Sequence, residues 1–128
     1  MDTADIADER RKILDGTYPA KIVAGRQRKH ILGTREFAQK QQQMQNDNTG
    51  SKPAILIADA KKLVDKYKGT GIIRIMPGSQ FPRERVDTGN VIGQTWVISL
   101  QKYVDTKRIE IMYSSDGVHV VPVSDHKK

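Results

Sequence analysis

The chain has 128 residues, a length that fits one domain of ordinary size. It contains no cysteine, which excludes disulfides, thiolate zinc sites and a cysteine nucleophile. No apolar run approaches the ~20 residues that a membrane-spanning helix needs, and we expect no membrane partner. With 37% hydrophobic and 5% aromatic residues, the core is expected to be modest and built mainly from Ile, Val and Leu.

The net charge of +7 is concentrated in one segment. Residues 10–40 hold nine basic and two acidic side chains, so this segment alone carries +7 and the remainder is neutral. Such a local excess indicates a polyanionic partner, with nucleic acid as the first hypothesis. An anionic membrane surface is the second hypothesis, but it would require an apolar face that the segment lacks. The third is a basic face that is merely solvated.

The first predicted element is a helix over residues 3–15. Acidic residues near its start and basic residues after them complement the helix dipole, and Gly16 ends it. This segment has few apolar residues, so we expect it to lead in from a longer protein. The expected lead-in, ribonuclease-like domain and tail cover residues 1–20, 21–124 and 125–128.

The basic segment that follows has no clear period. For residues 21–34 we expect a short extended piece and a loop. Thr34 is expected to cap a helix that reaches about Gln45, with Phe37 directed inward. Residues 46–53 have the composition of a loop.

A third helix is predicted from an Asp59 cap to Lys68, where glycines stop it. The pattern then changes to short β-rich runs, with a hairpin turn at Asp116-Gly117. The predicted strands cover residues 72–76, 91–100, 107–113 and 118–123. Helices followed by consecutive strands predict an α+β domain, with N-terminal helices packed on a four-stranded, roughly antiparallel sheet.

The motif RQRKHILGT, residues 26–34, could carry chemistry. Metal-free RNA cleavage needs a base for the 2′-hydroxyl proton, an acid for the leaving 5′-oxygen and cations for the phosphoryl oxygens. His30 can perform either proton transfer near pH 7, and the neighbouring lysine and arginines can supply the positive charge. The alternative is that His30 packs under the sheet and the cations are solvated.

A second motif, IMYSSDGVHVVP, covers residues 111–122 and includes the predicted hairpin turn. Because strand faces alternate, His119 should point away from Val118 and Val120, either into a cleft or toward water. The three histidines stand far apart in the sequence without metal-ligand spacing, so we expect no metal and no cofactor. We expect the third of them, His126, to be solvated.

Together, these segments resemble polymorphic toxin type 50 domains, which also occur at the ends of phage head-morphogenesis proteins. RQRKHILGT is similar to the family motif Lys-Gln-x-Lys-His-Ile-x-Gly, and MYSSDGVHVVP is similar to Tyr-Ser-x-x-Gly-x-His-Ile-Val-Pro. The resemblance covers about residues 26–122. It implies the barnase–EndoU–colicin–RelE type of metal-independent ribonuclease fold, in which one face of a four-stranded antiparallel sheet binds RNA.

The resemblance implies a toxic RNA endonuclease that works by 2′-hydroxyl attack and leaves a 2′,3′-cyclic phosphate. The expected catalytic residues are His30, Lys29, His119, Tyr113 and Ser114. The residues expected to hold the RNA phosphate are Arg26, Gln27 and Arg28, together with Lys29. Arg26 replaces a lysine of the family motif, which keeps the charge but removes a group able to donate a proton at neutral pH.

The partners implied are RNA, with transfer RNA among the candidates, and an immunity protein or antitoxin in the producing cell. The expected place of action is the bacterial cytoplasm, reached within a secreted toxin or a phage particle. The alternative from a different class is a non-enzymatic nucleic-acid-binding module of a phage particle or head-morphogenesis protein. A structural scaffold protein is the third class.

Overall fold

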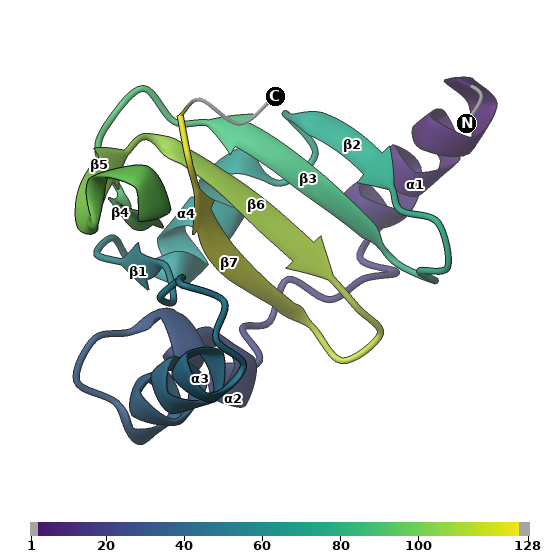
Figure 1. Ribbon diagram of the computed structural model, residues 1–128. Coiled ribbons are helices and arrows are strands. Elements are labelled where there is room, and N and C mark those ends of the chain that lie inside the picture. Colours follow the sequence, from purple (N-terminus) through teal and green to yellow (C-terminus); the bar gives the residue numbers. More distant parts are fainter. Residues whose placement is uncertain (1–2, 126–128) are drawn as a thin grey trace.

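A four-stranded antiparallel sheet in the order β2-β3-β6-β7 forms the centre of the computed structural model, which describes residues 3–125 (Figure 1). Its strands are β2 (Ile72–Ile75), β3 (Pro82–Asp87), β6 (Arg108–Tyr113) and β7 (Val118–Val123). A second antiparallel sheet, β1-β4-β5, contacts β7. It consists of β1 (Ile55–Leu56), β4 (Gly93–Val97) and β5 (Lys102–Thr106). The predicted α+β class is confirmed.

Helices α1 (Thr3–Asp15) and α4 (Ala60–Tyr67) pack on one face of the four-stranded sheet and lie behind it in Figure 1. The core between these layers includes Ile13 of α1, Val64 of α4 and Ile109 of β6, each at most 1% exposed. Burying such a side chain contributes about 1.5–3 kcal/mol. The opposite face of the sheet is turned to the viewer in Figure 1, and no described helix covers it. We call it the open face.

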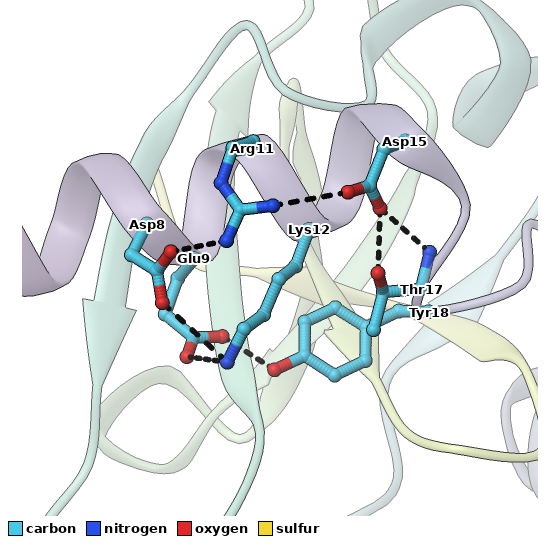
Figure 2. A network of polar contacts seen from close by, with 7 residues as sticks. All are labelled: Asp8, Glu9, Arg11, Lys12, Asp15, Thr17 and Tyr18. Carbon is cyan, nitrogen blue, oxygen red and sulfur yellow. Dashed lines mark hydrogen bonds and ion pairs between the residues drawn. The ribbon is translucent and has the colours of Figure 1, made fainter.

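Helix α1 belongs to this core, so the expected lead-in is packed with the rest of the domain. Tyr18, which follows the helix, is 7% exposed, and its hydroxyl donates to Glu9 Oε2 at 2.5 Å. Figure 2 shows this bond within the polar network along α1. Arg10 donates to the backbone oxygens of Gly69 and Gly71, which joins α1 to the loop before β2. Most of the predicted tail, residues 126–128, lies outside the described residues, as does His126.

Both predicted helix caps are present. Thr34 Oγ1 accepts a hydrogen bond from Phe37 N at 3.1 Å at the start of α3 (Arg35–Asn46). Asp59 Oδ1 accepts one from Lys62 N at 3.0 Å at the start of α4. Each side chain satisfies a backbone N–H that has no partner within the helix, which explains why the sequence located these boundaries well.

The basic motif forms short helices in place of the predicted loop. Helix α2 covers Ala24–Gln27, and a 3-10 helix, η1, continues over Arg28–His30. An extended piece does precede them, because Ile22 forms a parallel bridge with Val118 of β7. Seven helical residues complete too few turns to show an apolar stripe, so periodicity could not reveal them.

The sheet differs from the prediction in its strand membership. The segment predicted as one strand over residues 91–100 is β4 followed by the 3-10 helix η2 (Ile98–Leu100), and it belongs to the second sheet. Strand β3, which was not predicted, completes the four-stranded sheet by pairing with β2 and β6. Its sequence PRERVD lacks apolar alternation because the core-facing position is occupied by Glu84, which is fully buried.

Candidate active site

The two sequence motifs meet at the edge of β7. The side chain of Gln27 in α2 exchanges two hydrogen bonds with the backbone of Val120: Nε2 donates at 2.9 Å, and Oε1 accepts at 2.7 Å. Arg26 Nη1 donates to Ser114 Oγ at 3.2 Å, just after β6 ends. The basic motif is thereby fixed against the hairpin that carries His119.

A glycine in the hairpin turn permits this approach. Gly117 has a φ of 145°, and a Cβ at this position would lie 2.2 Å from the backbone oxygen of Lys21. That oxygen accepts a hydrogen bond from Val118 N at 2.7 Å. A side chain at position 117 would therefore push the segment leading into α2 away from β7.

Gln27 positions this assembly. Its side chain is 5% exposed, and both ends of its amide are occupied by the backbone of Val120. The amide pairs with the edge of β7 much as another strand would. We therefore assign Gln27 a positioning role; its expected phosphate contact stays a prediction and is not used in the chemistry proposed below.

His119 lies on the open face, as its alternation with the buried Val118 and Val120 predicted. It lines a pocket of about 240 Å³ together with Arg26, Arg83 and, from the turn, Ser114. Neither ring nitrogen of His119 has a hydrogen-bond partner among the described residues. The ring is therefore available to a ligand in the pocket. A larger hollow of about 480 Å³ on α1 shares no residue with this pocket.

The surroundings of His119 favour its neutral form. Burial, as the largest cause, and then the positive charges of His30, Arg26, Lys29 and Arg83 together lower its pKa to about 4. Both causes act on the imidazolium, since it loses hydration and meets like charge. At neutral pH the ring therefore holds a lone pair that can accept a proton.

His30 is half-buried at the end of η1, and its Nδ1 lies 3.0 Å from the backbone oxygen of Ala54. A carbonyl oxygen only accepts, so Nδ1 must carry the proton, and Nε2 is the nitrogen left for proton exchange. Burial lowers the pKa of His30 below its ordinary value of 6.5, and nearby lysines add to this effect. The Ala54 carbonyl opposes the shift because it stabilises the protonated ring.

A groove adjoins the pocket along β7. His30 and Val121 line this groove, which has a volume of about 450 Å³. Val121 is two residues beyond His119 on the same face of the strand, a separation of about 6.6 Å. The charge of His30 is also one of the causes that lower the pKa of His119.

Arg83 is a candidate site residue that sequence reasoning missed. It is opposite Met112 across β3 and β6, and Met112 is opposite His119 across β6 and β7, so the three form a row on the open face. Glu110 orients two arginines here, with an Oε1–Arg83 Nη1 distance of 3.9 Å and an Oε2–Arg85 Nη2 distance of 2.9 Å. Recognising Arg83 would have required the prediction of β3.

The chain matches the model of a family described as bacterial toxin 50 over residues 22–122, a range that includes both motifs. The chain belongs to the bacterial toxin 50 family. No curated protein and no solved structure matches it. The resemblance inferred from the two motifs is thus confirmed for the toxin family.

Of the other predicted site residues of this toxin 50 domain, some line the pocket and others lie outside it. The Tyr113 hydroxyl donates to Glu84 Oε1 at 2.6 Å on the core side of the sheet. Burial raises the pKa of Tyr113, and the neighbouring Glu84 raises it further. Only part of Tyr113 reaches the pocket, where Ser114 Oγ donates to the backbone oxygen of Gly117 at 2.8 Å. Lys29 is exposed, and Arg28 forms an ion pair with Glu36 at 3.3 Å.

Two further properties of the toxin 50 domain concern residues 3–125. Within that range, histidine and carboxylate side chains form no group of three or more that could hold a metal ion. None of the helices there combines the length and apolar character needed to span a membrane. The polar side chains that line the pocket include one imidazole, two guanidinium groups and the hydroxyls of two serines, beside apolar residues such as Phe81 and Met112.

Proposed function

We propose that this toxin domain is an endoribonuclease that cleaves RNA by attack of the 2′-hydroxyl on the adjacent phosphate. The observation that carries the proposal is the imidazole of His119 in a pocket lined by two arginines, with His30 in the groove that contains Val121 of the same strand. The lowered pKa of His119 favours the neutral ring. Two imidazoles can divide the two proton transfers of this reaction between them. The arginines can stabilise the charge that develops on the phosphoryl oxygens.

His119 is the proposed base. Its free ring nitrogen takes the proton of the 2′-hydroxyl while the 2′-oxygen forms a bond to phosphorus. The bond between phosphorus and the 5′-oxygen then breaks. The products are a 2′,3′-cyclic phosphate and a 5′-hydroxyl end. His119 suits the role of base because its low pKa keeps it unprotonated before the attack.

His30 is the proposed acid. The hydrogen bond to the carbonyl of Ala54 favours the protonated form of His30, and no comparable bond from the described residues favours protonated His119. When only one of the two histidines is protonated, we therefore expect it to be His30. A bound phosphodiester raises both pKa values because its negative charge favours the cations. His30 Nε2 then delivers its proton to the leaving 5′-oxygen, and exchange with water resets both rings.

Purified protein incubated with total RNA in EDTA tests the proposal. We expect discrete fragments that end in 2′,3′-cyclic phosphate. Intact RNA with altered gel mobility would instead support the non-enzymatic nucleic-acid-binding module. Cleavage that EDTA abolishes would contradict the metal-independent mechanism.

The proposed roles predict a bell-shaped dependence of kcat/KM on pH. Acid removes activity by protonating His119, whose pKa is about 4, and alkali removes it by deprotonating His30, whose pKa lies below 6.5. We expect kcat/KM to be highest between the two pKa values. Above the pKa of His30, kcat/KM should fall about tenfold per pH unit. Initial rates on a short RNA oligonucleotide from pH 3.5 to 9 measure the profile. A maximum above pH 8 would contradict the assignment.

Arg26 is predicted to contribute through its charge. Its guanidinium lines the pocket beside Ser114, and its ion pair with Asp116 is long, at 3.5 Å. Replacement by alanine should lower kcat/KM about 10- to 100-fold, because a charge-assisted bond to phosphate is lost. Arg28→Ala is the matched control, since Arg28 is exposed, lies outside the pocket and pairs with Glu36. Equal losses in both variants would point to overall charge in place of a specific phosphate contact.

An active toxin of this kind requires protection of the producing cell. We propose an immunity protein with an acidic surface, because opposite potentials accelerate encounter with the basic segment at residues 10–40. Such a partner would cover the pocket and compete with RNA for Arg26. Its affinity should therefore fall with increasing salt.

A further inference from the structure

The groove beside His30 contains Trp96, the only tryptophan of the chain. This half-buried side chain of β4 is held firmly: its Nε1 donates to the backbone oxygen of Gly50 at 3.1 Å. The ring of Tyr103 meets it edge-on, with centroids 5.2 Å apart and an interplanar angle of 73°. Trp96 is thus an aromatic surface in a fixed orientation.

The other groups of the groove suit a nucleotide. Lys40 and Lys52 bring positive charge, and none of the described residues that line the groove is acidic. Lys52 Nζ lies over the Trp96 ring, 4.4 Å from its centroid, so a flexible ammonium group occupies a place over one face of the indole. A nucleobase could take that place, and the displaced ammonium could then bind the phosphate of the same nucleotide.

We infer that this groove is a nucleobase subsite in which Trp96 stacks on the base of the nucleotide 3′ to the scissile phosphate. The inference rests on the proposed function, because it uses His30 as the acid. The 5′-oxygen that His30 protonates belongs to the 3′ nucleotide, and His30 itself lines the groove. The volume of about 450 Å³ lies within the range of about 300–1,000 Å³ typical of ligand pockets.

Fluorescence of the unmodified protein tests the subsite directly, since Trp96 is its only tryptophan. The probes are a mixed-sequence DNA 12-mer, which lacks the attacking 2′-hydroxyl, and an abasic DNA 12-mer with the same number of phosphates. We expect saturable quenching by the first and affinity at least about tenfold lower for the second, because stacking is lost. Absent quenching, or equal affinity for both probes, would overturn the inference.

Cleavage gives an independent readout. The substrates are an RNA oligonucleotide that the protein cuts and the same oligonucleotide with an abasic residue immediately 3′ to the cut. The unmodified protein should cleave the abasic substrate about tenfold more slowly. Trp96→Ala should cleave both at similar rates, and Trp96→Phe should restore part of the difference, with thermal unfolding checking that each variant folds.

The two proposals can fail separately. If the unmodified protein cleaves both RNA substrates equally well, the subsite is overturned and the ribonuclease stands. If RNA is not cleaved at all, the ribonuclease fails. Tighter binding of the mixed-sequence DNA than of the abasic DNA in the fluorescence titration would then still support a nucleobase site at Trp96.

Discussion

His119→Ala is expected to reduce RNA cleavage about 10²–10⁴-fold, the usual contribution of a general acid–base group. The neutral ring of His119 has no hydrogen-bond partner among the described residues, so its removal leaves no described partner unsatisfied. The fold should therefore persist, which thermal unfolding by circular dichroism can verify. Rates of cyclic phosphate formation on a defined RNA oligonucleotide measure the loss.

Met112→Leu is the matched control for this variant. Met112 is directly opposite His119 on β6 and lines the same pocket, but it cannot transfer protons. We expect its cleavage rate to stay within a fewfold of the parent. Imidazole added to His119→Ala should restore part of the activity, a result that a purely structural role would not produce. Cleavage by His119→Ala at nearly the parental rate would remove the proposed base.

Local patterns predicted those parts of the fold that local interactions determine. The helix at residues 3–15, both caps and the strands β6 and β7 follow from features read within about ten residues. The same reasoning placed His119 on the face opposite Val118, because alternation along a strand depends only on neighbouring residues. These parts could be predicted without knowledge of the tertiary structure.

Tertiary contacts determined the parts that were missed. Strand β3 carries Glu84 in the core, where the backbone of a distant loop and Tyr113 satisfy its carboxylate. Nothing in the sequence near Glu84 indicates these partners, so the local pattern of residues 82–87 did not predict a strand. Likewise, nothing in the sequence near Gln27 indicates that its amide pairs with a strand edge 93 residues away. The Trp96 groove forms only when the second sheet packs beside β7.

Two residues of the β6–β7 hairpin, Tyr113 and His119, direct their side chains to opposite faces of the sheet. Tyr113 ends β6 with its hydroxyl on the core side, whereas His119 of β7 faces the pocket. The motif that contains both residues therefore combines a structural group and a proposed catalytic group. Its tyrosine and histidine should respond differently to substitution, which activity and stability measurements can separate.

Glu84→Ala is expected to lower the free energy of unfolding by about 3 kcal/mol. Glu84 is fully buried, and its carboxylate accepts hydrogen bonds from Gly69 N at 2.9 Å, Gly71 N at 2.6 Å and the Tyr113 hydroxyl at 2.6 Å. Alanine leaves these three donors without their acceptor and opens a void in the core. For a domain of this size the melting temperature should fall by about 10 °C, measured by circular dichroism.

Tyr113→Phe is the control that separates this network from catalysis. It removes one hydrogen bond and leaves the two backbone bonds of Glu84 in place, so the expected loss of stability is about 1 kcal/mol. Cleavage should remain within a fewfold of the parent, because the hydroxyl of Tyr113 is bound to Glu84 on the side of the sheet away from His119. A large loss of cleavage in a stably folded Tyr113→Phe protein would return this tyrosine to the catalytic group. A Glu84→Ala protein as stable as the parent would show that water can replace the carboxylate.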